Sequence, residues 1–454
     1  MKIHFIGIGG IGISALAQYY LEIGEQVSGS DLVSSEITEK LKKQGPKIFI
    51  GAHNAKNLTK IIGREKDKFL KVIYSPAVQE DNPELKEAKK LGIKCLSYPE
   101  ALGELTKKYF TIAITGTHGK STTTAMTALI LIKAGLDPTV IVGTKVKEFK
   151  NSNFRMGKSK YLIIEACEYE ESFLNYWPKI AIITNIEKEH LDYYKNLKNI
   201  LKAFEKFVSH LPKNGILITN REDKNISKLH IQVQKRSFSI KQKDTEKLKK
   251  ILKVPGEHNI YNALAALSIA RTLKIPDKVS YKVLSEYKGS WRRFEIKKTT
   301  INNHLLFIIS DYAHHPTEVK VTLKACREKF SKQKIWCVFQ PHQYQRTYYL
   351  FNDFVKVFKQ AIDKNWIDRL IITDIYDVAG REEKKIKSKV SSEKLVEEIK
   401  NNLTNFAMTR NVKYISSIKQ TAAYLKKNLR DKEILIIMGA GDIYKLSYPQ
   451  IAIV

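Results

Sequence analysis

Residues 110–121 read FTIAITGTHGKS, a short apolar run that leads directly into a loop of small residues. Such a loop lets backbone N–H groups close around phosphate oxygens, and a helix expected from about Thr122 adds the positive end of its dipole. A lysine at this position, Lys120, reaches the β- and γ-phosphates, and the hydroxyl of Ser121 suits Mg²⁺. The pattern departs from the general P-loop because Ile114 stands where the first glycine would be. The expected ATP contacts are Gly116, Thr117, His118, Gly119, Lys120, Ser121 and Thr122.

The same alternation of strand-like and helix-like segments extends along the whole chain. Short apolar runs alternate with amphipathic segments, which is typical of parallel α/β sheets. We therefore predict three domains, each a mostly parallel sheet with flanking helices: Rossmann-like at the N-terminus, P-loop in the centre and Rossmann-like at the C-terminus. The predicted boundaries and opening strands are 1–108 with Ile3–Ile8, 109–294 with Phe110–Thr115, and 295–454 with Leu305–Ser310.

A second glycine motif, GIGGIG at Gly7–Gly12, follows the first expected strand. It has the GxGxxG form, and Asp31 follows after the roughly 20 residues typical of sites for a dinucleotide pyrophosphate and ribose. On these residues alone an NAD-dependent oxidoreductase stays open. A UDP-sugar also carries a pyrophosphate, so the loop chemistry favours neither ligand.

Two candidate metal ligands follow strands of the central block. Glu165 comes directly after the run Tyr161–Ile164, and His190 comes shortly after Ile180–Thr184. Alone, each is more often a surface or capping residue, but both belong to the block that carries the phosphate loop. Since Mg²⁺ prefers oxygen ligands, the histidine indicates a second, less typical site.

The third block contributes two loops rich in histidine, SDYAHHPTE at 310–318 and FQPHQYQRT at 339–347. Imidazole and guanidinium groups at strand ends suit an anionic substrate and an anionic transition state. Six of the eleven histidines lie in expected strand-end or junction loops, namely His118, His190, His258, His314, His315 and His342.

Composition excludes several classes of protein. An apolar fraction of 43% is that of a folded protein, and no run reaches the roughly 18 apolar residues of a membrane span. Four cysteines lie far apart without a CxxC pair, which argues against disulfides or zinc and favours the cytoplasm. The net charge of +31 is scattered along the chain, so we expect a solvated surface and no nucleic-acid partner. A basic field of this kind still helps to attract anionic small molecules.

Together these motifs resemble the Mur ligases, which build the peptide of bacterial cell-wall precursors. The TGTxGK loop is shared by all Mur ligases and by folylpolyglutamate synthetases, whereas the GIGG start and both third-block loops resemble the L-alanine-adding members. A related ligase that recycles murein tripeptide shares the front half, but the loop at 339–347 argues against it. The similarity runs in order through 4–12, 29–31, 115–121, 165–168, 185–187, 254–259, 292–294 and the two third-block loops.

The resemblance implies an ATP-dependent ligase that joins L-alanine to the lactyl carboxylate of UDP-N-acetylmuramic acid through an acyl phosphate. It implies a UDP-substrate-binding domain, a central ATP-binding domain and a C-terminal domain that closes over ATP and the amino acid. It also implies Mg²⁺, with two ions expected. The oligomeric state stays open between monomer and homodimer. A non-catalytic nucleotide-binding regulator would lack the combination of Glu165, His190 and His314.

The resemblance also implies roles for single residues. Catalytic roles fall to Lys120, Glu165, His190, His314 and Arg346, and metal contacts to Ser121, Glu165 and His190. Further ATP contacts fall to Asn259, Arg293 and Asp311. The UDP-substrate contacts are Gly9, Gly10, Ile11, Gly12, Ser30, Asp31 and Ser75, and the amino-acid pocket contains His315, His342 and Arg346. Some relatives carbamoylate a lysine after the His190 motif, and Lys202 is the nearest candidate, left open. Ala313, Gln343 and Gln345 depart from common residues in these loops, so the fine shape of the pocket is open.

Overall fold

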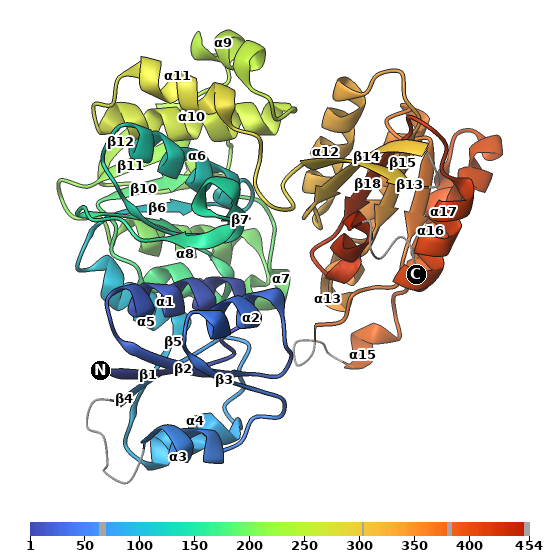
Figure 1. Cartoon of the computed structure of the whole chain (residues 1–454). Helices are drawn as coiled ribbons and strands as arrows, with labels where there is room; N and C mark the ends of the chain where they lie inside the picture. The colour runs from blue at the N-terminus through green and yellow to red at the C-terminus, as the bar shows by residue number, and fades with distance from the viewer. Residues whose placement is uncertain (63–69, 302–303, 379–383, 449–454) are drawn as a thin grey trace. The chain divides into compact units, whose positions relative to one another are not determined.

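The structure is a computed structural model that describes residues 1–62, 70–301, 304–378 and 384–448. Its contacts divide the chain into two compact units, each described here by itself (Figure 1). The first unit comprises Met1–Glu187, Leu197–Gln242 and Asn262–Leu284, and the second comprises Lys188–Asn196, Lys243–Tyr261 and Ser285–Val454.

The first unit begins with a parallel sheet in the order β3-β2-β1-β4-β5. Its strands are β1 (Lys2–Ile6), β2 (Gln26–Asp31), β3 (Lys47–Ile50), β4 (Leu70–Tyr74) and β5 (Lys94–Ser97). One face is covered by α1 (Ile11–Glu22), α2 (Glu36–Lys43) and α5 (Tyr98–Thr106), and the other by α3 (Lys56–Ile62) and α4 (Pro83–Lys90) (Figure 1). In this order the chain reverses direction across the sheet between β1 and β4, which is where such sheets bind ligands.

Strand β1 ends at Ile6, two residues before the predicted end, because Gly7 turns the chain with φ 77°. Its alternate side chains pack toward α3 and α4, where Ile6, Leu58, Val72 and Leu85 form a buried cluster. The glycine loop is therefore anchored on one side by a rigid strand.

A larger sheet follows in the same unit, in the order β12-β11-β10-β6-β9-β7-β8 among the described residues. Only β7 and β8 pair antiparallel. Since β10, β6 and β9 are neighbours, the loops after their carboxyl ends meet at one edge. The strands are β6 (Phe110–Thr115), β7 (Thr139–Val146), β8 (Ser152–Arg155), β9 (Tyr161–Glu165), β10 (Ile180–Ile183), β11 (Ile216–Asn220) and β12 (Gln234–Phe238). The helices around it are α6 (Lys120–Lys133), α8 (Leu197–Val208), α10 (Glu257–Thr272) and α11 (Asp277–Glu286), and the unit boundary crosses the last two.

The second unit holds a sheet in the order β13-β14-β18-β15-β16-β17, parallel except for β13. Its strands are β13 (Glu295–Ile301), β14 (His304–Asp311), β15 (Ile335–Phe339), β16 (Arg369–Ile372), β17 (Val412–Tyr414) and β18 (Ile434–Met438). Apolar residues of α12 (Pro316–Lys329), α14 (Phe351–Asp363) and α16 (Ser392–Asn402) pack on one face. Those of α17 (Ile418–Asn428) and of a 3₁₀ turn at Asp442–Ser447 pack on the other. Shorter or more peripheral helices are α7 (Leu191–Tyr194), α9 (Asp244–Ile251), α13 (Tyr344–Tyr349) and α15 (Lys384–Lys387).

These three mostly parallel sheets with flanking helices confirm the predicted fold class. The prediction that the third block opens with Leu305–Ser310 was wrong, because β13 precedes that strand and pairs with it antiparallel. A lysine-bearing edge strand has no long apolar run, so periodicity did not reveal it. The boundaries 1–108, 109–294 and 295–454 stay a prediction. Over the described ranges, no helix combines the length and apolar character that crossing a membrane requires.

Candidate functional site

The loop between β6 and α6 has the backbone geometry of an anion site. Helix α6 begins at Lys120, two residues earlier than predicted, and its N-cap Gly119 has φ 84° with no side-chain cap. The first N–H groups of an uncapped helix need partners from outside the helix, and an anion is well suited to them. A side chain at Gly119 would meet Oδ1 of Asn262 at 2.2 Å, so the loop tolerates only glycine there.

Lys120 is folded into this loop. Its Nζ donates to the carbonyl oxygens of Gly116 at 2.6 Å and Thr117 at 3.0 Å, and it pairs with the Glu168 carboxylate at 3.0 Å. The side chains of Lys120 and Glu168 are 14% and 3% exposed. Burial alone would lower the pKa of Lys120, but the Glu168 carboxylate holds that pKa well above its usual value. The lysine is therefore a fixed positive charge at the mouth of the loop.

Ser121 and Glu165 come together beside it. Ser121 Oγ donates to Glu165 Oε1 at 3.0 Å, and the backbone N–H of Gly143 donates to Glu165 Oε2 at 2.7 Å. A hydroxyl and a carboxylate at this distance are the oxygen donors that Mg²⁺ prefers, so these two residues fit that ion. Gly143, on β7, was not predicted to take part.

The segment after β10 fixes the other side of the loop. The Asn185 side chain accepts from the N–H of His118 at 2.8 Å and donates to its carbonyl at 3.0 Å. The N–H of Glu187 donates to Thr117 Oγ1 at 2.8 Å. These bonds give the Asn185 side chain and the Glu187 backbone a structural role beside the loop.

Several backbone N–H groups of the N-terminal glycine loop already donate hydrogen bonds within the protein. The N–H groups of Gly7 and Ile8 both donate to the Ser30 carbonyl, at 2.8 and 3.0 Å. The N–H of Gly9 donates to Asp31 Oδ2 at 2.8 Å. The N–H of Gly10 donates to the Gly7 carbonyl at 3.2 Å. Over the described ranges, the donors left for a ligand are therefore the N–H groups that follow at the start of α1, whose N-cap Gly10 has no side-chain cap.

This arrangement changes the roles expected within the predicted UDP site. Asp31 braces Gly9, and the Ser30 hydroxyl donates to the buried Glu84 at 2.8 Å, so neither group points freely at a ligand. Ser75 packs against Gly7, whose added Cβ would lie 3.0 Å from Ser75 Cβ. Gly10, Ile11 and Gly12 supply the uncapped helix start.

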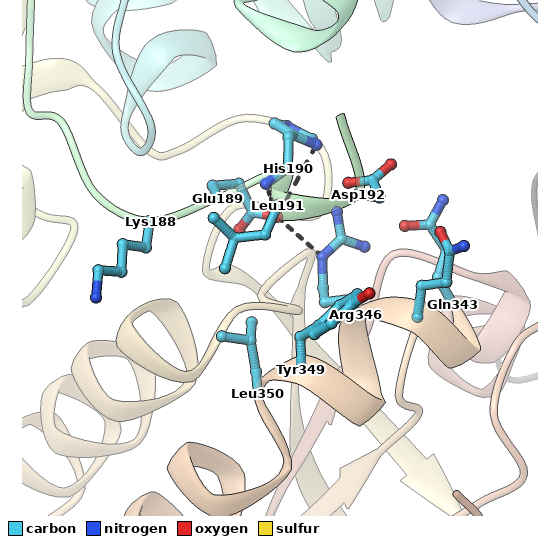
Figure 2. Close-up of a pocket in the computed structure, with 10 residues that line it drawn as sticks. Lys188, Glu189, His190, Leu191, Asp192, Gln343, Arg346, Tyr349 and Leu350 are labelled. Carbon is cyan, nitrogen blue, oxygen red and sulfur yellow. Dashed lines mark hydrogen bonds and ion pairs between the residues drawn. The ribbon is translucent and has the colours of Figure 1, made fainter. Parts of the chain in front are cut away.

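In the second unit, Arg346 forms a buried ion pair that the sequence analysis missed. Its Nε donates to Glu189 Oε1 at 3.0 Å, and both side chains are 9% exposed (Figure 2). Its Nη1 lies 3.1 Å from His342 Nδ1. Burial would raise the pKa of Glu189, but Arg346 holds it well below its usual value. Glu189 is therefore an anion at neutral pH.

The predicted histidines gather around this pair. His314 and His342 have ring centroids 5.9 Å apart, and His315 Nε2 lies 3.7 Å from Glu189 Oε2. His315 also caps α12. Burial lowers the pKa of His314 to about 4, so its imidazole is neutral at physiological pH.

A small pocket, partly open to solvent, lies beside Arg346. No hydrogen bond from Arg346 Nη2 is found within the described ranges, so this N–H edge remains for a ligand. An arginine edge of this kind suits a carboxylate. The pocket is lined by Lys188, Glu189, His190, Leu191, Asp192, Gln343, Gln345, Arg346, Tyr349 and Leu350 (Figure 2).

The remaining predicted residues also have internal partners. Asp311 accepts backbone N–H groups of Phe294 at 2.7 Å and Ala313 at 2.8 Å, and burial raises its pKa to about 6. The Arg293 guanidinium lies 4.8 Å from the centre of the Tyr312 ring. Asn259 Nδ2 donates to the Pro255 carbonyl, and Lys202 is exposed on α8. Their roles toward ATP, and any carbamoylation, stay predictions.

The structure therefore places the predicted residues in separate groups, which belong to different units. Glu165 joins the phosphate loop in the first unit, whereas His190 belongs to the second unit with the Arg346 cluster. Glu168 and Glu189 were missed. Glu168 ends the quoted range 165–168 and Glu189 directly precedes His190, but only the fold reveals which cation each carboxylate pairs with.

Comparisons with known proteins agree along the chain. Models described as "Mur ligase family, catalytic domain", "Mur ligase middle domain" and "Mur ligase, glutamate ligase domain" match residues 2–110, 114–251 and 292–441. UDP-N-acetylmuramate–L-alanine ligase of Acetivibrio thermocellus is 41% identical, over 98% of this chain and 94% of that protein.

Solved structures show the same fold. A UDP-N-acetylmuramate–alanine ligase from Thermotoga maritima has a TM-score of 0.76 at 27% identity, covering 98% of this chain and 97% of that one. A murein peptide ligase from Psychrobacter arcticus has a TM-score of 0.69 at 21% identity, covering 99% and 98%, which shows the fold alone. With family models matched in all three sheets and a relative this similar over almost its full length, the chain belongs to the Mur ligase family.

Proposed function

We propose that this chain joins L-alanine to the lactyl carboxylate of UDP-N-acetylmuramic acid at the expense of ATP, in the synthesis of peptidoglycan precursors. The observation that carries the proposal is the phosphate loop, which gathers Lys120, Ser121 and Glu165 at the uncapped start of α6. The full-length similarity to an L-alanine ligase supports the choice of substrates. Because the reaction consumes ATP and a nucleotide sugar, we place it in the cytoplasm.

The chemistry explains why a phosphate loop is needed. A carboxylate is a poor electrophile, so its oxygen first takes the γ-phosphoryl group of ATP, which forms an acyl phosphate and releases ADP. The neutral amine of L-alanine then attacks, and the tetrahedral intermediate collapses to an amide with release of phosphate. Lys120 and the N–H groups of α6 stabilise the phosphate charge during transfer, where positioning and electrostatics supply most of the catalysis.

Ser121 and Glu165 would hold Mg²⁺, and His190 is proposed as a ligand of a second ion. When bound, the metal offsets negative charge on the phosphates. Within the chain, Glu165 is already oriented for this role by Ser121 and by the N–H of Gly143.

The other two substrates are assigned by charge and by free donors. The pyrophosphate of the UDP-sugar suits the first turn of α1, since the preceding N–H groups are satisfied within the loop. A carboxylate of the amino acid or of the lactyl group suits Nη2 of Arg346. The neutral imidazole of His314, in the same unit, adds a hydrogen-bonding group that carries no competing charge.

An ADP-release assay tests this proposal. With UDP-N-acetylmuramic acid present, each of the twenty amino acids is supplied in turn, and L-alanine is expected to give the fastest release. ATP turnover is expected only when both the sugar nucleotide and the amino acid are present. Equal or faster turnover with L-alanyl-D-glutamyl-diaminopimelate would assign the chain to tripeptide recycling instead.

A further inference from the structure

Glu84, on α4, is a fully buried carboxylate at the centre of a polar cluster in the first sheet's layer. Its Oε2 accepts from His4 Nε2 at 2.8 Å and Ser30 Oγ at 2.8 Å, with both Glu84 and His4 0% exposed. Its Oε1 accepts from Asn57 Nδ2 at 2.8 Å and lies 3.1 Å from His53 Nδ1. One carboxylate thus links β1, β2, the segment after β3, and α3.

The cluster is matched to an ionised carboxylate. Burial would raise the pKa of Glu84, but the bonds from His4 and His53 hold it well below its usual value. Both oxygens accept from more than one donor, which an amide with a single acceptor oxygen cannot reproduce. A glutamine here would turn an NH₂ group toward two of these donors.

Ser30 connects this cluster to the glycine loop. Its hydroxyl donates to Glu84, while its carbonyl accepts the N–H groups of Gly7 and Ile8. The next residue, Asp31, accepts the N–H of Gly9. The end of β2 therefore holds three consecutive N–H groups, and the Ser30 side chain ties that strand end to Glu84.

We propose that Glu84 is a positioning residue for the UDP-sugar, acting through Ser30 on the glycine loop and the start of α1. The inference rests on the proposed function, because it takes the pyrophosphate of the sugar nucleotide as the ligand of that loop. It assigns Glu84 no contact with substrate. Its effect is on the geometry of the donors, and small misplacements of binding groups are costly.

The test compares Glu84→Gln and Ser30→Ala with the wild-type chain. Both variants are expected to raise KM for UDP-N-acetylmuramic acid about tenfold, by analogy with the lower end of what it costs to lose a hydrogen bond that orients a metal ligand. KM for ATP and for L-alanine should stay within about twofold, since those substrates are assigned elsewhere. Ser30→Ala removes one hydroxyl and keeps the carboxylate, so it carries the test if Glu84→Gln fails to fold.

Glu433→Gln is the matched control. Glu433 is 7% exposed and accepts from Trp336 Nε1 and the N–H of Arg430, both at 2.9 Å, in the second unit. It should lower the unfolding temperature without a selective change in any KM. A purely structural role for Glu84 predicts the same behaviour for Glu84→Gln.

Calorimetric titration with UDP-N-acetylmuramic acid distinguishes failure of the positioning role of Glu84 from failure of the proposed function. If wild-type protein binds the sugar nucleotide and folded variants bind it equally well, the positioning role is wrong and the proposed function stands. If wild-type protein binds no sugar nucleotide, the proposed function itself fails. Weaker binding by folded Ser30→Ala supports the positioning role.

Discussion

Lys120 has partners within the chain as well as the phosphate contacts that we propose for it. The structure places its ammonium group on two loop carbonyls and on Glu168, which is 3% exposed. Removing the lysine therefore leaves a buried carboxylate without its cation, and such a group is costly. A substitution at Lys120 is therefore expected to affect stability as well as any phosphate contact.

We expect Lys120→Ala to lower kcat by about 10³-fold or more, the scale for losing a charge contact in phosphoryl transfer. It should also lower the free energy of unfolding by about 1–3 kcal/mol, because Glu168 loses its partner. Adding Glu168→Gln should restore much of the stability and none of the activity. Denaturant unfolding and ADP release measure the two effects separately.

Near-normal turnover of Lys120→Ala, with an unchanged circular dichroism spectrum, would contradict the assignment of ATP to this loop. Equal stability of the single and double variants would show that the Glu168 pair contributes little. The two results are independent, so the role of Lys120 in turnover and its contribution to stability are tested separately.

At the scale of elements, α1 and α6 share one design. Each follows a parallel strand and a glycine loop, and neither has a side-chain cap at its N-terminus. The glycines are not equivalent, however. Gly119 adopts φ 84°, whereas Gly9 is required because a Cβ would lie 2.9 Å from Asp31 Oδ2 and 3.0 Å from Thr38 Cγ2.

We expect Gly9→Val to weaken binding of UDP-N-acetylmuramic acid strongly, because the side chain displaces Asp31 from the loop. ATP binding should be nearly unchanged, since the loop proposed to bind ATP follows β6, which belongs to a different sheet from β1. Isothermal titration with each nucleotide measures both effects. Wild-type protein should give no calorimetric signal with millimolar NAD or NADP. A saturable NAD signal that is lost in Gly9→Val would instead favour the oxidoreductase alternative.

At the scale of the whole molecule, the net charge of +31 sets a field that acts on every substrate according to its charge. ATP and the UDP-sugar are polyanions, whereas L-alanine is a zwitterion with no net charge. A positive field raises the local concentration and arrival rate of anions, and salt screens it over about 10 Å at 0.1 M.

We therefore expect kcat/KM for ATP and for the UDP-sugar to fall several-fold as ionic strength rises from about 0.05 to 0.5 M. The value for L-alanine, measured with both nucleotides saturating, should change much less. Initial-rate ADP release over a sodium chloride series provides the comparison. Equal sensitivity for all three substrates would mean that the basic surface does not contribute to nucleotide capture.

The sequence alone determined the fold class and located the glycine loop between a strand and a helix, whereas its role in phosphate binding stays a prediction. Apolar runs of strand length, followed by loops of small residues, specify parallel α/β sheets because those patterns depend on neighbours in the chain. The run Phe110–Thr115 was located to the residue for this reason. The antiparallel β13 was missed because its short, lysine-bearing pattern is set by pairing with β14.

Only the tertiary structure decided which polar groups face one another. Glu84 lies 54 residues from Ser30, Glu168 lies 48 from Lys120, and Glu189 lies 157 from Arg346. No periodicity reports such pairs, because hydrogen bonds and ion pairs act over a few ångströms in space regardless of chain separation. The same physics engages Ser30 and Asp31: the buried Ser30 hydroxyl donates to Glu84, and the half-buried Asp31 carboxylate accepts the N–H of Gly9 that the fold brings beside it.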